Sequence, residues 1–195
     1  LVIYNNTAID CGWRRTKNKK GGNVWIEKAI APVFVNNLMV DNRYGIRQPG
    51  KDGADIDNSV LSPNYFFAST DTGVKQQGKD FKMIVWNDNN LISHAPEDLS
   101  KLFIKFTQND KMNINCESDD PANGAPLKWN PAWDFHLQLG VPQLTGALTA
   151  VKPNFPSGLA FFGMKKVKWV SNTDDQNYYF SSSVASNFFG AFGAK

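Results

Sequence analysis

The chain has 195 residues and a mass of 21.8 kDa, which suits one hydrophobic core and excludes two complete enzymatic domains. With 42% hydrophobic and 20% charged residues it is not disordered by charge. The net charge of +3 is too small by itself to indicate a polyanionic partner. No apolar run approaches the ~20 residues of a membrane-spanning helix, and no signal peptide is visible at Leu1. We therefore expect a soluble protein without a membrane span, and a start at leucine is typical of an excised or processed segment.

Short runs of branched and aromatic residues predict β-strands along the whole chain. In chain order they are residues 24–30, 33–40 with an interruption at Asn36 and Asn37, 65–69, 81–86, 102–107, 112–116, 133–139, 167–170 and 178–181. Residues 133–139 are the clearest case, because Trp133, Phe135, Leu137 and Leu139 alternate with polar residues. Residues 96–101 predict one short turn of helix, since a proline is followed by two acids. The chain is therefore predicted to be all-β.

Long connections rich in Gly, Pro, Asn and Asp separate these strands, notably 41–63, 69–80, 117–130 and 140–157. Loops above ~12–15 residues are uncommon in compact domains and are usually functional or ordered by a partner. We predict one antiparallel β-sandwich domain at 1–180, with the topology of a jelly roll with long loops, and a C-terminal arm or tail at 181–195.

Five basic residues lie together before a Gly-Gly pair, and they are Arg14, Arg15, Lys17, Lys19 and Lys20. They could contact the phosphates of a nucleic acid, or they could form a solvated hairpin loop.

Aromatic residues make up 13% of the chain, more than one small core needs unless some rings face a partner or ligand. Trp129 and Trp133 are candidates for partner contact or for stacking on sugars. The tail contains Phe188, Phe189 and Phe192, which would gain by burial on another surface, so we predict an assembly tail.

No motif dictates catalysis, a metal site or a cofactor, and we predict none of them. The two histidines, His94 and His136, are predicted to be surface residues; a glycosidase that uses two carboxylates stays an alternative because sequence cannot show their separation. The acidic stretches 52–57, 117–120 and 174–175 are predicted to be polar turns rather than calcium loops. Cys11 and Cys116 are expected to be buried thiols, with one long-range disulfide as the alternative.

Residues 94–146 resemble the late part of a parvovirus-type capsid protein of the densovirus kind. The resemblance rests on 95–106, a proline-led approach into a strand, and on 134–142, a strand followed by Gly-Val-Pro. It implies an eight-stranded antiparallel jelly roll and an icosahedral shell around single-stranded DNA. The chain departs from that family in its shortness and in lacking a phospholipase segment and a long basic arm.

These observations favour a structural coat protein of the virion that assembles with copies of itself, with Arg14 to Lys20 as the contact to packaged nucleic acid. The alternative is an extracellular, lectin-like β-sandwich that binds carbohydrate through Trp129 and Trp133.

Overall fold

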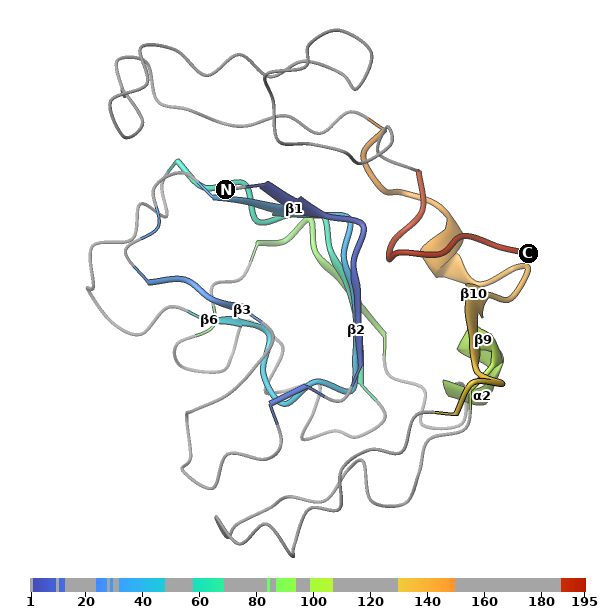
Figure 1. The fold of residues 1–195 in the computed structure, drawn as a ribbon. Coiled ribbons are helices and arrows are strands. Elements are labelled where there is room, and N and C mark those ends of the chain that lie inside the picture. The colour runs from blue at the N-terminus through green and yellow to red at the C-terminus, as the bar shows by residue number, and fades with distance from the viewer. Residues whose placement is uncertain are drawn as a thin grey trace, which may run out of the picture.

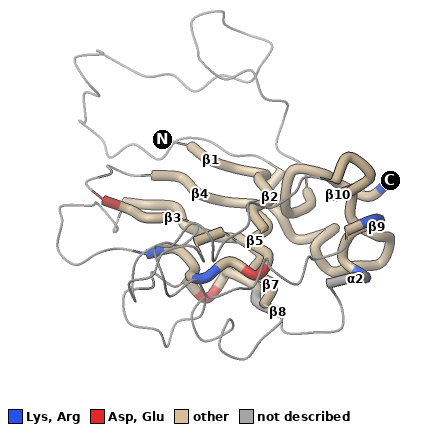
Figure 2. The backbone as a smooth tube through the Cα atoms, turned by 60° about the horizontal axis from the view of Figure 1, so that its bottom comes forward, with Lys and Arg blue, Asp and Glu red and all other residues tan. Residues whose placement is uncertain are grey.

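Short strands make up most of the regular structure. The computed structural model describes residues 2–9, 11–12, 24–27, 29, 32–47, 58–68, 84, 87–93, 99–106, 130–149 and 187–195. The largest sheet has four parallel strands in the order β2 (Thr7–Ile9), β5 (Leu38–Val40), β7 (Tyr65–Phe67) and β8 (Leu91–Ser93). In Figure 2 these four strands follow one another down the view, from β2 to β8.

Two smaller parallel pairs complete a three-sided stack. One side is β1 (Val2–Tyr4) on β4 (Val33–Val35), and another is β3 (Val24–Trp25) on β6 (Ile46–Arg47). In Figure 1 the strand β1, the strand β2 and the pair β3–β6 lie along three different sides of one interior. Each pass of the chain around the three sides forms one layer, which we call a rung, and successive rungs stack on one another. This is the arrangement of a β-solenoid.

The interior of the stack is filled by side chains from all three sides. Its buried members are Ile26, Phe34, Met39, Ile46, Leu61 and Phe66. Because neighbouring residues of a strand point to opposite faces, the residues beside Met39 and Phe66 point outward. The two central strands of this sheet, β5 and β7, are therefore apolar on both faces.

A ladder of asparagine side chains joins the rungs at the corner before the four-stranded sheet. Asn6 Nδ2 donates to Asn37 Oδ1 at 3.0 Å, Asn37 Nδ2 donates to Asn64 Oδ1 at 2.9 Å, and Asn64 Nδ2 donates to Asn90 Oδ1 at 3.4 Å. The backbone N–H of each of the first three also donates to the Oδ1 of the next, at 3.0, 3.0 and 2.8 Å. We call these four residues the asparagine ladder. It satisfies backbone groups that the corner removes from ordinary strand pairing.

The corners themselves need a left-handed backbone. Asn5 has φ 51°, Asn36 has φ 59° and Asp41 has φ 47°. Asn and Asp adopt this region far more readily than branched residues do. The sequence thus places an Asn-Asn pair at each of the first two corners, the first for the turn and the second for the ladder.

A second layer packs on the outer face of the four-stranded sheet. It contains α2 (Leu99–Leu102), the antiparallel pair β9 (Phe103–Lys105) and β10 (Asp134–Leu137), the 3-10 turn η2 (Pro142–Leu144) and residues 187–195. Between the layers lie Leu38, Val40, Tyr65, Phe67, Leu102, Phe103, Phe106, Leu137 and Phe189. A third apolar group, Val33 and Val35 with Val2, Tyr4 and Val60, covers the outside of β1 and β4.

The all-β class predicted from the sequence is confirmed, but the antiparallel jelly roll is not. Among the described residues five strand pairs are parallel and one, β9–β10, is antiparallel. Strands expected at 33–40, 65–69, 102–107 and 133–139 are present, and the turn of helix appears as α2. Leu139 was expected inside but is 80% exposed, because β10 ends at Leu137 and the chain then turns. Residues 41–47 were expected in a loop but are buried and contain β6.

Removing a central member of the asparagine ladder should destabilise the fold. Asn64 is fully buried, donates to the carbonyls of Phe34 and Leu61 at 2.9 Å, and accepts from Asn37. Asn64→Ala leaves these buried groups without partners, so we expect urea denaturation to show a loss of about 3 kcal/mol in the free energy of unfolding.

Asn89→Ala is the matched control, because Asn89 is exposed and precedes the ladder residue Asn90. It should change the free energy of unfolding by less than about 0.5 kcal/mol. Equal stabilities of the two variants would show that the ladder does not hold the rungs.

Candidate functional site

Aromatic rings and guanidinium groups alternate on the β3–β6 side of the stack. Arg47 Cζ lies 4.9 Å from the ring centre of Trp25 and 4.6 Å from that of Tyr44. Arg43 Cζ lies 5.2 Å from the Tyr44 ring centre. These distances are those of cation–π contacts. We call these four residues the Trp–Arg stack.

The register of two parallel strands builds this stack. Trp25 of β3 pairs with Arg47 of β6, and the Ile26 N–H donates to the Arg47 carbonyl at 2.8 Å. Ile26 and Ile46 point into the interior core. The alternating residues Trp25 and Arg47 consequently lie on the outer side, one against the other.

The two arginines are buried, although they carry charge. Arg43 is 3% exposed and Arg47 is 1% exposed. Burial lowers the pKa of Arg47; the Coulombic interaction with Tyr44 raises it, and Arg43 lowers it further. Arginine keeps its proton under such conditions and is weakly enough hydrated to stack on rings. The guanidinium of Arg47 therefore acts as a fixed support for the indole.

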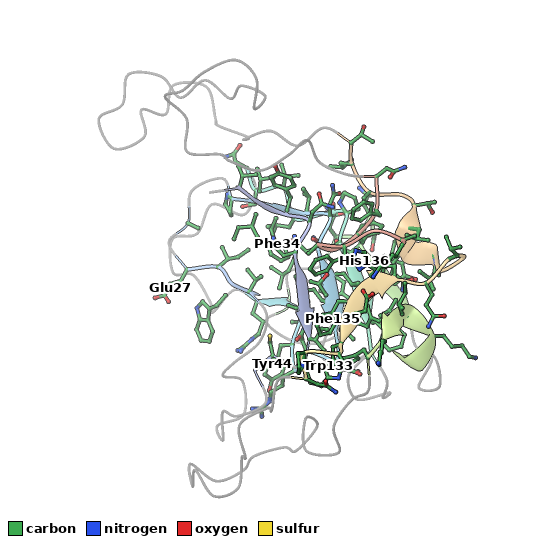
Figure 3. The ribbon with its side chains drawn as sticks, turned by 45° about the vertical axis from the view of Figure 1, so that its right-hand side comes forward. Glu27, Phe34, Tyr44, Trp133, Phe135 and His136 are labelled. Carbon is green, nitrogen blue, oxygen red and sulfur yellow. The ribbon has the colours of Figure 1, made fainter. Side chains whose placement is uncertain are left out.

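The Trp–Arg stack and Glu27 together present an aromatic ring and a carboxylate at the surface. Trp25 is 42% exposed, and Glu27, two residues further on, is also exposed. Figure 3 shows Glu27 pointing away from the body of the protein, whereas Phe34 lies in its interior. This arrangement can stack a flat ligand and accept a hydrogen bond from it.

A second polar cluster lies on β10. Asp134 Oδ2 accepts from Lys195 Nζ at 2.9 Å, and Asp134 Oδ1 lies 2.5 Å from His136 Nδ1. The Lys195 hydrogen bond first, and those from His136 next, hold the pKa of Asp134 well below its ordinary value. The His136 ring lies 5.4 Å from that of Phe192. The cluster thus attaches the C-terminal residues to β10, and His136 lies at the surface as predicted, 37% of its side chain being exposed.

The structure places only part of the sequence-predicted sites. Outside the described residues lie Arg14, Arg15, Lys17, Lys19, Lys20, Trp129, His94, Cys116 and the three acidic stretches 52–57, 117–120 and 174–175. Cys11 is exposed, not buried as expected. Among the described residues no group of three His, Cys, Asp or Glu side chains could hold a metal ion.

Trp133 belongs to the second layer's packing. Its ring lies 5.2 Å from that of Phe106 and 6.0 Å from that of Phe135, both edge to face. Figure 3 shows Trp133 and Phe135 close together beside β10. This half-buried position gives Trp133 a role in packing, and a sugar would have to compete with these rings.

The tail residues are divided between core and surface. Phe189 is fully buried and its ring lies 5.6 Å from that of Tyr65, whereas Phe192 is 44% exposed. Phe188 is half-buried, and its carbonyl accepts from Asn5 Nδ2 at 2.7 Å. The Gly190 N–H donates to the Asn36 carbonyl at 2.8 Å. In the described structure this segment packs on the chain's own sheet, so Phe189 is not available to a partner.

Gly190 makes that close approach sterically feasible. Its φ is +88°, and a Cβ built there would meet Thr7 Oγ1 at 2.6 Å. A side chain at this position would push the C-terminal residues off β2.

Sequence reasoning missed the asparagine ladder and the Trp–Arg stack. The signal for the ladder was an asparagine before each of four strands, at spacings of 31, 27 and 26 residues. Trp25 and Arg47 lie on two-residue strands, which leave too short a pattern to recognise.

Comparisons with protein families, with curated protein sequences and with solved structures found no match to this chain. Within the described ranges, none of the helices has the length and apolarity needed to cross a membrane. A function for this chain must therefore be inferred from the geometry of its own residues.

The attachment of the C-terminal residues should weaken in acid. Because the pKa of Asp134 is lowered in the folded protein, its stabilising contribution is fully present above the ordinary aspartate pKa of about 4 and is lost as the pH falls below it. Asp134→Asn should therefore unfold at a lower temperature than the parent at pH 7, and this difference should shrink toward pH 2.

The difference in thermal stability between the parent and Lys195→Met should shrink toward pH 2 in the same way. Lys195→Met should also lower the thermal stability less when it is added to Asp134→Asn than when it is made in the parent. A difference between parent and Asp134→Asn that stays constant from pH 7 to pH 2 would contradict this assignment.

Proposed function

We propose that the protein is a structural protein whose copies associate end to end through the two terminal residues of the asparagine ladder, Asn6 and Asn90. As proposed, it has no catalytic role and needs no cofactor.

The two ends of the ladder are chemically complementary. At the first rung, Asn6 is exposed, and no described residue donates to its Oδ1. At the last rung, Asn90 is 5% exposed and its Nδ2 finds no acceptor in the described part of the chain. The Asn90 N–H already donates to the Asn87 carbonyl, so the amide Nδ2 is the group left over. A buried donor without a partner costs about 1–3 kcal/mol, which the Oδ1 of Asn6 from a second copy would recover once the residues that cover Asn90 are displaced.

The strand edges next to these residues favour the same contact. Among the described strands, β2 pairs only with β5, and β8 pairs only with β7. Leu91, at the start of β8, is 43% exposed. Unpaired edges of this kind are templates for a further strand. In the proposed contact β2 of one copy would follow β8 of another and continue the parallel sheet.

Such a contact joins one surface of a copy, at β8, to a different surface of the next copy, at β2. Contacts of this type close into rings or continue as open filaments, depending on the rotation between copies. The coat protein that the capsid resemblance implies, a shell in the virion around single-stranded DNA, is the more specific form of this proposal. The basic residues Arg14 to Lys20 remain its proposed contact to DNA.

Replacing the last ladder amide by a carboxylate tests the proposal. Asn90→Asp keeps the oxygen that accepts from Asn64 but removes the Nδ2 donor and would repel the Asn6 oxygen of the next copy. Sedimentation velocity over a range of concentrations should show association of the parent and at least about tenfold weaker association of Asn90→Asp.

Asn89→Asp introduces the same charge one residue earlier, outside the ladder, and should associate like the parent. Leu91→Lys, a charge on the exposed edge, should also weaken association without touching the ladder. A parent that is monomeric at every concentration, or association of both edge variants equal to that of Asn89→Asp, would refute the proposal.

Electron microscopy of the associated parent distinguishes its forms. Filaments or rings would support the general proposal alone, whereas uniform spherical particles that retain DNA would support the coat protein.

A further inference from the structure

We infer that the outer face of Trp25, together with Glu27, is a binding site for a pyranose ring of a neutral glycan. This site lies on the β3–β6 side and does not use the strand edges of the proposed assembly.

The indole is held rigidly before any ligand arrives. Arg47 lies on one face of the Trp25 ring, is itself 1% exposed, and also lies 4.6 Å from the Tyr44 ring centre. The Arg47 carbonyl is bound by the Ile26 N–H. Because Arg47 lies over one face of the indole and Trp25 as a whole is 42% exposed, we take the opposite face as the one that a ligand meets. A ring held in this way loses little conformational freedom when a ligand stacks on it.

Glu27 supplies the polar partner that a sugar needs. Burial alternates along this segment, with Trp25 exposed, Ile26 buried and Glu27 exposed, so ring and carboxylate lie on the same side. Two residues of extended chain span at most about 7 Å, a distance that one sugar ring and its hydroxyl groups can bridge. No residue in the described part of the chain forms a hydrogen bond or ion pair with the Glu27 carboxylate, and its oxygens can accept from those hydroxyls.

The charges around Trp25 favour a neutral ligand over a nucleic acid. The positive charge of Arg47 is buried beneath the indole, where a phosphate cannot reach it. Among the described residues, the charge that reaches the surface beside the ring is the carboxylate of Glu27, which repels phosphates. An apolar sugar face can stack on the indole while its hydroxyls meet the carboxylate.

Affinity gel electrophoresis tests the site, with soluble neutral polysaccharides (a mannan, a β-glucan, a xylan and a galactan) as probes and a poly-dT oligonucleotide as the competing class. The parent should be retarded by at least one polysaccharide. Trp25→Ala should weaken that binding at least about tenfold, as expected for loss of a central aromatic contact. Glu27→Gln should weaken it several-fold, and Trp25→Tyr should retain most of it.

Leu139→Ala is the control, because Leu139 is 80% exposed and lies in the second layer, away from β3. It should bind like the parent. Circular dichroism tests whether each variant is folded; if Trp25→Ala is not, Glu27→Gln decides the outcome, with Trp25→Tyr as the variant that should still bind.

Three results would overturn the inference. The first is that no polysaccharide retards the parent. The second is that Trp25→Ala binds as the parent does or, where that variant is not folded, that Glu27→Gln does. The third is that the substitutions reduce binding to poly-dT and leave polysaccharide binding unchanged. Because sedimentation measures association in the absence of glycan, failure of this site and failure of the proposed assembly are separate results.

Discussion

The buried side-chain amides at the rung corner are the constraint on which the rest of the fold depends. A chain that turns from one side of the stack to the next must leave the regular strand ladder, and its backbone groups still need partners in a region without water. Asn37 and Asn64 solve this problem because each supplies an acceptor to the rung before it and a donor to the rung after it. Their hydrogen bonds fix the register of the rungs, and with it which side chains point inward.

That fixed register explains why so many aromatic residues can be buried in a small chain. In β7, Phe66 points into the interior core, while Tyr65 and Phe67 pack against the second layer and Phe189. The strands of a parallel sheet covered on both faces are near-continuous runs of apolar residues. The aromatic surplus that sequence analysis assigned to a partner is thus consumed in part by the chain's own second layer.

Local patterns predicted the strands, and pairing between distant residues could not be predicted in the same way. Residues 133–139 and 33–40 show their strand character within a few positions, and β10, β4 and β5 lie there. Whether two strands run parallel depends on the path that the connecting segment takes, which local patterns do not show. The spacing between successive ladder residues also varies, from 26 to 31 residues, so it forms no regular repeat. Asn36 and Asn37 look like an ordinary turn in sequence because a ladder exists only when several rungs are stacked. The Trp–Arg stack was hidden for the same reason, since Trp25 and Arg47 meet only through the β3–β6 register.

The proposed assembly and the proposed glycan site reinforce each other physically. End-to-end association would repeat the β3–β6 side of the molecule at regular intervals, so that copies of Trp25 and Glu27 would occur in a row along the stack. A single stacked sugar gives only weak binding, because few contacts must offset the entropy lost on association. Once one copy has bound a polymeric glycan, the next binding event becomes intramolecular and is governed by an effective concentration. A row of weak sites on a stack could therefore hold a polysaccharide firmly, whereas the isolated chain would release it quickly.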